Sequence, residues 1–187
     1  MYFVQISKET TNLKSQFKAL RSTQGLCICG LLIAIYVVLS LFNIPVSQVI
    51  EIRFGFLVFI AAGLIGGPVM GFTVGFLADV VNCLIRGFAY FPGFSFNYGL
   101  LGAVSGLILY RSRVGRSRAV LCALTEYIIS VTLSTLWLHI MYGYELRTLI
   151  ISRFIKCTLS FVVNSILIYV FLEAFQRIAH TALPARR

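Results

Sequence analysis

Six long apolar runs, joined by short polar connections, fill most of this chain between residues 25 and 175. They cover approximately residues 25–42, 52–65, 69–85, 94–110, 119–141 and 148–175. A helix crosses the hydrocarbon of a bilayer in roughly 20 residues, so a chain of 187 residues has room for about six crossings. The runs also lack the period-2 alternation of a membrane β-barrel. They predict an all-α integral membrane protein with six transmembrane helices.

Composition excludes the soluble classes of protein. The chain is 59% hydrophobic and 12% charged, and its mean hydropathy is +0.92, whereas soluble domains carry about 25% charged residues. No GxxxxGK[ST] sequence is present, so ATP-driven work would have to come from partner chains. The net charge is +10. In a membrane protein such an excess of basic residues reports on orientation in the bilayer, so no nucleic-acid partner is predicted.

The basic residues predict how the helices are oriented. Lysine and arginine accumulate on the cytoplasmic side of membrane segments. Eleven fall on one side of a six-helix arrangement: Lys8, Lys14, Lys18, Arg21, Arg111, Arg113, Arg116, Arg118, Arg177, Arg186 and Arg187. Five fall toward the other side: Arg53, Arg86, Arg147, Arg153 and Lys156. We therefore expect both termini in the cytoplasm.

This orientation divides the chain into three parts. Residues 1–24 are a basic cytoplasmic segment, in which Leu13, Phe17 and Leu20 recur at helical spacing. That spacing predicts an amphipathic helix on the membrane surface, although a frayed tail has the same composition. Residues 25–178 are the six-helix membrane domain, and residues 179–187 are a cytoplasmic tail.

Neither a metal site nor a catalytic centre is predicted. His139 has no second histidine nearby, which argues against zinc. The cysteines are odd in number and dispersed, as expected for reduced packing residues; they are Cys27, Cys29, Cys83, Cys122 and Cys157. We predict no cofactor and no enzymatic activity, and we interpret Glu126 and Glu173 as structural acids that neighbouring arginines could neutralise.

Asp79 is the acidic residue that plain membrane packing explains least. It continues a stripe of Gly67, Gly71 and Gly75 at i+4 spacing, and glycines on one face let another backbone approach closely. Asp79 should therefore face the protein interior. A carboxylate there costs about 2.5–3.5 kcal/mol on insertion scales. Two interpretations remain open: a buried structural pair, or a hydrogen-bond acceptor for a ligand.

An aromatic segment after Arg86 is the second unusual feature. Tyr90, Phe91 and Phe94 surround a Pro-Gly turn, and Asn97 follows. Such aromatic residues often form an interfacial belt. They could equally stack on a flat heteroaromatic ring, with Asn97 offering both a donor and an acceptor. We expect this segment to be an outer loop through Tyr98.

Two further sets of residues allow both a structural and a functional interpretation. The outer arginines could simply snorkel, or together they could form an electropositive mouth for carboxylates. Gly30 and Ala34 form a small-xxx-small step on the first apolar run. That step predicts a docking face for another helix, either within the fold or on a partner.

Several short motifs, in this order and spacing, resemble the FolT family, the folate-binding S components of energy-coupling factor (ECF) transporters. They are residues 32–40 (LIAIYVVLS), 52–56 (IRFGF), 66–68 (GGP), 78–79 (AD) and 91–94 (FPGF). The resemblance by motif covers roughly residues 26–110. It implies a six-helix protein of the bacterial plasma membrane that captures folate, or a reduced folate, from outside. It also implies partners: a transmembrane coupling subunit and two ATPase subunits.

The resemblance implies roles for particular residues. Asp79 and Asn97 would meet the pterin edge, and Gly30 and Ala34 would meet the coupling subunit. Residues 43–50 match the family's outer lid. The aromatic candidates for stacking are Tyr90, Phe91, Phe94 and Trp137, and the candidates for the carboxylates are Arg86, Arg147 and Arg153.

Three alternatives to a folate carrier remain at this stage. The same architecture could bind another vitamin, such as riboflavin, thiamine or a queuosine precursor. An intramembrane lipid-modifying enzyme would need clustered acids, and this chain has no DxxD or DDxxD sequence. A purely structural subunit would explain the glycine stripe but not Asp79 beside an aromatic, polar segment.

Overall fold

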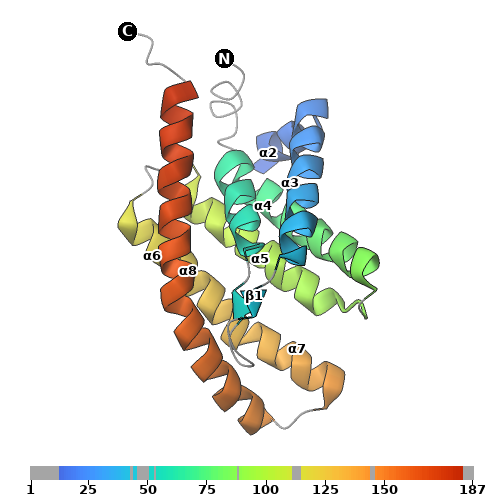
Figure 1. The fold of residues 1–187 in the computed structure, drawn as a ribbon. Helices are drawn as coiled ribbons and strands as arrows, with labels where there is room; N and C mark the ends of the chain where they lie inside the picture. The colour runs from blue at the N-terminus through green and yellow to red at the C-terminus, as the bar shows by residue number, and fades with distance from the viewer. Residues whose placement is uncertain are drawn as a thin grey trace.

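A computed structural model describes residues 13–42, 44–45, 51–52, 54–87, 89–110, 115–143 and 146–182. Figure 1 shows a helical protein with one minimal strand pair. Its elements are α2 (Leu13–Leu20), α3 (Thr23–Leu41), β1 (Ile44–Pro45), β2 (Glu51–Ile52), α4 (Phe56–Arg86), α5 (Pro92–Leu109), α6 (Arg116–Val131), α7 (Leu133–Tyr142) and α8 (Leu146–Ala182).

The long helix α4 folds back on itself at Gly67. Gly67 has φ 79° and ψ −173°, and Pro68 follows it. Proline lacks an N–H and disfavours helical geometry in the preceding residue, and glycine tolerates a positive φ. A Cβ placed on Gly71 would lie 3.1 Å from the Cα of Gly63, although eight residues of straight helix would span about 12 Å. The two halves of α4 therefore lie side by side.

This hairpin explains why the six apolar runs predicted from the sequence correspond to five candidate membrane-spanning stretches in the described part of the structure. Five helical stretches among the described residues are long and apolar enough to cross a membrane, and α4 supplies two of the predicted runs. The second run, expected from about residue 52, becomes helical only at Phe56, because Glu51–Ile52 pairs antiparallel with Ile44–Pro45. The fifth run bends at Thr132, between α6 and α7.

The expectation of an outer loop through Tyr98 is also wrong. Helix α5 begins at Pro92, a residue whose fixed φ and missing N–H suit the first turn of a helix. Residues Phe94, Asn97 and Tyr98 are therefore helical. Of the expected lid, residues 43 and 46–50 lie outside the described part of the chain.

Helix α2 and the C-terminal end of α8 lie at the same end of the molecule (Figure 1). Residues Leu13–Leu20 are helical, as the spacing of Leu13, Phe17 and Leu20 predicts. The buried Gln16 side chain of α2 accepts a hydrogen bond from the N–H of Val69, just after the α4 turn (3.4 Å). Helix α8 continues to Ala182, past the expected boundary at residue 178. Lys8, Arg53, Arg111, Arg113, Arg186 and Arg187 lie outside the described residues.

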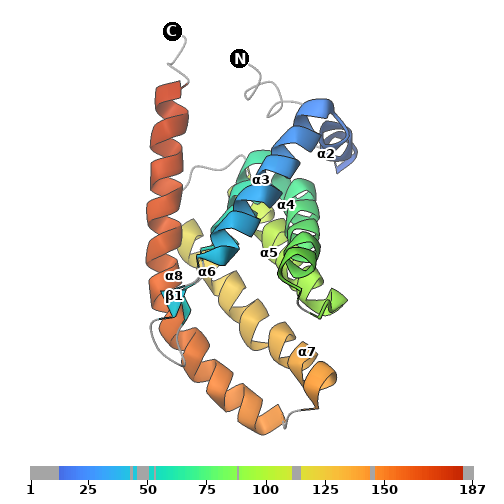
Figure 2. The same ribbon diagram turned by 45° about the vertical axis from the view of Figure 1, so that its right-hand side comes forward.

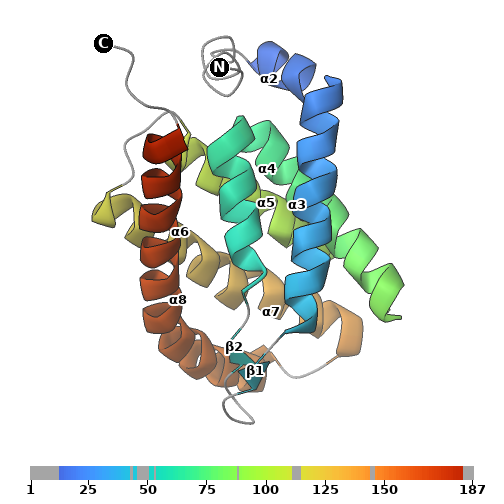
Figure 3. The ribbon, with the colours of Figure 1, turned by 45° about the horizontal axis from the view of Figure 1, so that its top comes forward.

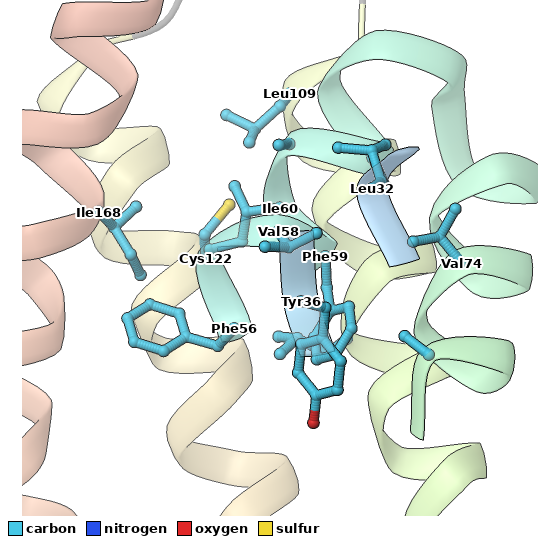
Figure 4. Packing of buried hydrophobic residues seen from close by; sticks show 14 of the residues in the cluster. Leu32, Tyr36, Phe56, Val58, Phe59, Ile60, Val74, Leu109, Cys122 and Ile168 are labelled. Atoms are coloured by element: carbon cyan, nitrogen blue, oxygen red, sulfur yellow. The ribbon is translucent and has the colours of Figure 1, made fainter. Parts of the chain in front are cut away.

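The helices form two groups, which are clearest in Figure 2: α3, α4 and α5 on one side, and α6, α7 and α8 on the other. The view in Figure 3 likewise separates α8 from α3. The core lies in the first group and reaches across to Cys122 and Ile168 (Figure 4). Its centre is aromatic, with the ring of Phe59 4.7 Å from that of Tyr36 and 5.2 Å from that of Tyr98.

Candidate functional site

A cavity of about 590 Å³ lies between the two groups of helices. Ligand pockets typically span about 300–1,000 Å³, so the space suits one small molecule. We name its two sides by the helices that supply them. The α4–α5 wall contains residues of α3, α4 and α5, and the α6–α8 wall contains residues of α6, α7 and α8.

Asp79 lies in the α4–α5 wall and is 5% exposed. The prediction that it faces the interior is confirmed. The hydroxyl of Ser95 on α5 donates a hydrogen bond to its Oδ2 atom at 2.7 Å. Glycine packing positions this pair, because a Cβ on Gly75 would overlap the backbone of Tyr98. Asp79 is thus fixed through one oxygen on a wall that faces the cavity.

One face of α4 continues the polar lining toward the C-terminal end of the helix. Asn82, Cys83 and Arg86 follow Asp79 at i+3, i+4 and i+7, and all line the cavity. The Oδ1 of Asn82 accepts a hydrogen bond from the Ser40 hydroxyl (2.7 Å). Arg86 Nη1 donates to the Ser40 carbonyl (3.0 Å). The ends of α3 and α4 are thereby tied together beside the cavity.

Asn97 joins α5 to α7. It is 3% exposed; its Nδ2 donates to Ser134 Oγ and its Oδ1 accepts from Trp137 Nε1, both at 3.0 Å. Trp137 in turn packs against Phe91, with 5.7 Å between ring centroids, and Phe91 lies edge-on to Phe94. Three of the four predicted aromatic residues, Phe91, Phe94 and Trp137, therefore form one connected cluster with Asn97.

The α6–α8 wall is polar as well. Asn164 Nδ2 donates to Glu126 Oε2 at 3.0 Å, and Arg153 Nη1 lies 3.4 Å from the carbonyl of Ser130. Lys156, which lies between Arg153 and Asn164 along α8, also lines the cavity. Glu126 accepts this hydrogen bond from Asn164 and lines the cavity. Glu173 pairs with Arg177 at 2.7 Å, as expected.

The predicted binding residues divide into two sets. Five line the cavity: Asp79, Arg86, Phe94, Asn97 and Arg153. Four do not: Tyr90 is exposed, Phe91 and Trp137 stand behind Asn97 and Phe94, and Arg147 is exposed near the start of α8.

The sequence interpretation missed several lining residues, including Tyr36, Ser40, Asn82, Tyr98 and Lys156. A helical-wheel continuation from Asp79 would have found Asn82. Ser40 and Tyr36 depend on how α3 packs against α4, which no local spacing encodes.

The lining can bind a polar, partly anionic molecule. It presents carboxylates (Asp79, Glu126), amides, hydroxyls and three cations (Arg86, Arg153, Lys156) beside aromatic rings. Within the described part of the chain, no cluster of three His, Cys, Asp or Glu residues could hold a metal ion. Outside the cavity, Gly30 and Ala34 are exposed, and a Cβ on Gly30 would meet nothing within 4 Å.

Residues 20–177 match the family model described as ECF-type riboflavin transporter, S component. The chain is 29% identical over 141 residues to "Folate transporter FolT" of Clostridium novyi (strain NT), covering 74% of this chain and 81% of that protein. An uncharacterized protein of Mycoplasma genitalium is 33% identical over 133 residues, or 65% of this chain, but the match spans only 45% of that protein. The solved "Crystal structure of FolT bound with folic acid" is 32% identical, with a TM-score of 0.74, over 82% of this chain and 95% of that chain.

Proposed function

The chain belongs to the FolT family of ECF-transporter S components, and we propose that it captures folate from outside the cell and passes it to an energising module. One observation carries this proposal. A buried carboxylate faces cations across a cavity of about 590 Å³, in a chain that is 32% identical to a FolT solved with folic acid.

The chemistry of folate matches this lining. Its flat pterin has an edge of N–H donors, which suits the carboxylate of Asp79. The pterin and the aromatic middle of the molecule can stack on the ring of Phe94. Its glutamate carries two carboxylates, which suit the cations of the lining.

Riboflavin is the main alternative ligand, because the matching family model is described as a riboflavin transporter S component. It is also a flat heteroaromatic vitamin, but it carries no carboxylate. The three lining cations favour the anionic ligand, and so do the named relatives, both of which are folate proteins.

Direct binding to the purified chain in detergent tests the proposal. Trp137 is the single tryptophan, and it donates to Asn97 beside the cavity. We expect folic acid to quench its fluorescence saturably at one ligand per chain. Isothermal titration calorimetry provides a check that is independent of ligand absorbance. Riboflavin and thiamine should neither bind nor compete. Saturation by riboflavin without a response to folic acid would refute the proposal and leave the family assignment intact.

The family implies a partner module in the membrane. We propose that this module is a transmembrane coupling subunit with two ATPase subunits, that it docks on Gly30 and Ala34, and that both ends of this chain face the cytoplasm of a bacterial cell. Ala34→Trp should spare folate binding but reduce co-purification with the module. Val170→Trp is the matched control, because Val170 is 56% exposed on α8. Equal co-purification of both variants would reject the docking face.

A further inference from the structure

Lys156 occupies an unusual place for a lysine. It lies on α8, seven residues after the start of the apolar span at Leu149, or roughly 10 Å along the helix axis. The span is 27 residues long, or about 40 Å, so Lys156 lies in the first part of a helix that is longer than the roughly 30 Å hydrocarbon core of a bilayer. The side chain is half-buried and lines the cavity.

Nothing in the described part of the chain neutralises this ammonium group. No hydrogen bond or ion pair is found for Lys156 among those residues. The acids that share its cavity accept hydrogen bonds from neutral side chains: Ser95 donates to Asp79 and Asn164 donates to Glu126. A partly buried ammonium group loses hydration, which is costly unless something pairs with it. The structure thus leaves a cation directed at a space that can hold a ligand.

Lys156 has suitable neighbours on its own helix. Arg153 is one turn before it and Ser160 one turn after it, and both line the cavity. Arg153 Nη1 contacts the Ser130 carbonyl (3.4 Å), which steadies the guanidinium against the wall. The two other predicted carboxylate ligands are placed differently. Arg86 is tied to the Ser40 carbonyl on the opposite wall, and Arg147 is exposed outside the lining.

We propose that Lys156, together with Arg153, forms the subsite that receives the anionic tail of the ligand. The inference rests on the proposed folate function and gives the bound molecule a direction. The pterin edge meets Asp79 on the α4–α5 wall, and the glutamate carboxylates meet the α6–α8 wall. The three rotatable N–H donors of a lysine adapt to carboxylates without a fixed fork geometry.

The test compares two ligands on the full-length chain in detergent. Pteroic acid, used as its neutral carboxamide, keeps the pterin, the aromatic ring and the amide of folic acid but lacks the glutamate and both of its carboxylates. In Lys156→Met we expect affinity for folic acid to fall about 10- to 100-fold, as for a lost charge-assisted hydrogen bond, and affinity for the carboxamide to change less than about twofold. Arg147→Met, which removes one positive charge outside the lining, should leave both affinities unchanged.

The outcomes are distinguishable. Unchanged folic acid binding in Lys156→Met would overturn the subsite and leave a lysine that merely snorkels. An equal loss for both ligands would also overturn it, because Lys156 would then support the pterin end or the fold. Retained binding of the carboxamide shows that the variant is folded, and Lys156→Gln repeats the comparison with a polar side chain. If the unmodified chain binds neither ligand, the proposed function itself fails, and the subsite fails with it.

Discussion

The two groups of helices are built on different packing principles. In the α3–α5 group, glycines bring backbones together, and 61% of the apolar stretch of α4 is buried within the protein. Along α6 and α7 the corresponding share is 28%. This second group presents bulky apolar side chains outward, such as Leu121, Ile128 and Ile140, which are 48–57% exposed and suit contact with lipid.

The difference indicates a division of labour around the cavity. Backbones in close contact leave little freedom, so the α4–α5 wall can hold Asp79 and Ser95 in a fixed geometry. The α6–α8 wall has fewer such constraints, and its cavity-facing residues include the long, flexible side chains of Arg153 and Lys156. A fixed wall suits recognition of a rigid ring, and an adaptable wall suits a flexible anionic tail.

The largest expected effect comes from filling the glycine contact. A Cβ on Gly71 would overlap the backbone oxygen of Gly102, which cannot move as a flexible side chain could. Gly71→Ala should therefore destabilise the protein by about 1–3 kcal/mol or more. A lower thermal melting midpoint in detergent would measure the loss.

Gly30→Ala is the matched control for this substitution. It makes the same chemical change within α3, where a Cβ meets nothing within 4 Å. It should be neutral or stabilising, because alanine favours helices over glycine by roughly 0.5–1 kcal/mol. Equal melting of both variants would show that the α4–α5 contact is not the rigid element inferred above.

Some features of the fold and the site could be predicted from the sequence, and others could not. The glycine stripe correctly predicted a buried Asp79, because helical periodicity is local information. The Gly-Gly-Pro break between the runs 52–65 and 69–85 likewise predicted the turn at Gly67. Neither pattern showed that Ser95 is the partner of Asp79, since that depends on how α5 packs on α4. The basic residues near both ends of the chain predicted that α2 and the C-terminal end of α8 lie at the same end of the molecule (Figure 1). The cavity position of Lys156 emerges only when α8 is placed opposite α4.

Replacing the carboxylate of Asp79 is expected to have the next largest effect. Asp79→Asn keeps the shape of the side chain but removes the charge that accepts from the pterin N–H groups. We expect affinity for folic acid to fall about 10- to 100-fold, the range for a hydrogen bond to a charged group, as measured by calorimetry. Melting should not fall, because a neutral amide is cheaper than a carboxylate at membrane depth.

Ser95→Ala is the companion to that variant. It leaves the carboxylate in place but removes the donor at 2.7 Å that orients it. A smaller loss, up to about tenfold, is expected for one neutral hydrogen bond. If Ser95→Ala were as damaging as Asp79→Asn, the charge itself would not be the recognition element.

A smaller effect should come from the link between the groups at Asn97. Trp137→Phe keeps an aromatic ring against Phe91 but loses the hydrogen bond to Asn97 Oδ1. Calorimetry should show a two- to tenfold loss of affinity for folic acid, in line with about 0.5–1.5 kcal/mol for one hydrogen bond. In an Asn97→Ala background, Trp137→Phe should cost nothing further. An undiminished effect in that background would mean that Trp137 acts on the ligand without Asn97.

The smallest effect is expected at Glu126, and it tests the comparison most directly. Among the described lining residues each wall has one acid, but Glu126 accepts from the Asn164 amide (3.0 Å), and a glutamine oxygen can accept the same bond. If only the α4–α5 wall recognises the pterin edge, Glu126→Gln should change affinity for folic acid by less than about twofold. A tenfold loss there, with a mild Asp79→Asn, would reverse the ligand in the cavity. The rigid wall would then face the tail, and the division of labour drawn from the packing would be wrong.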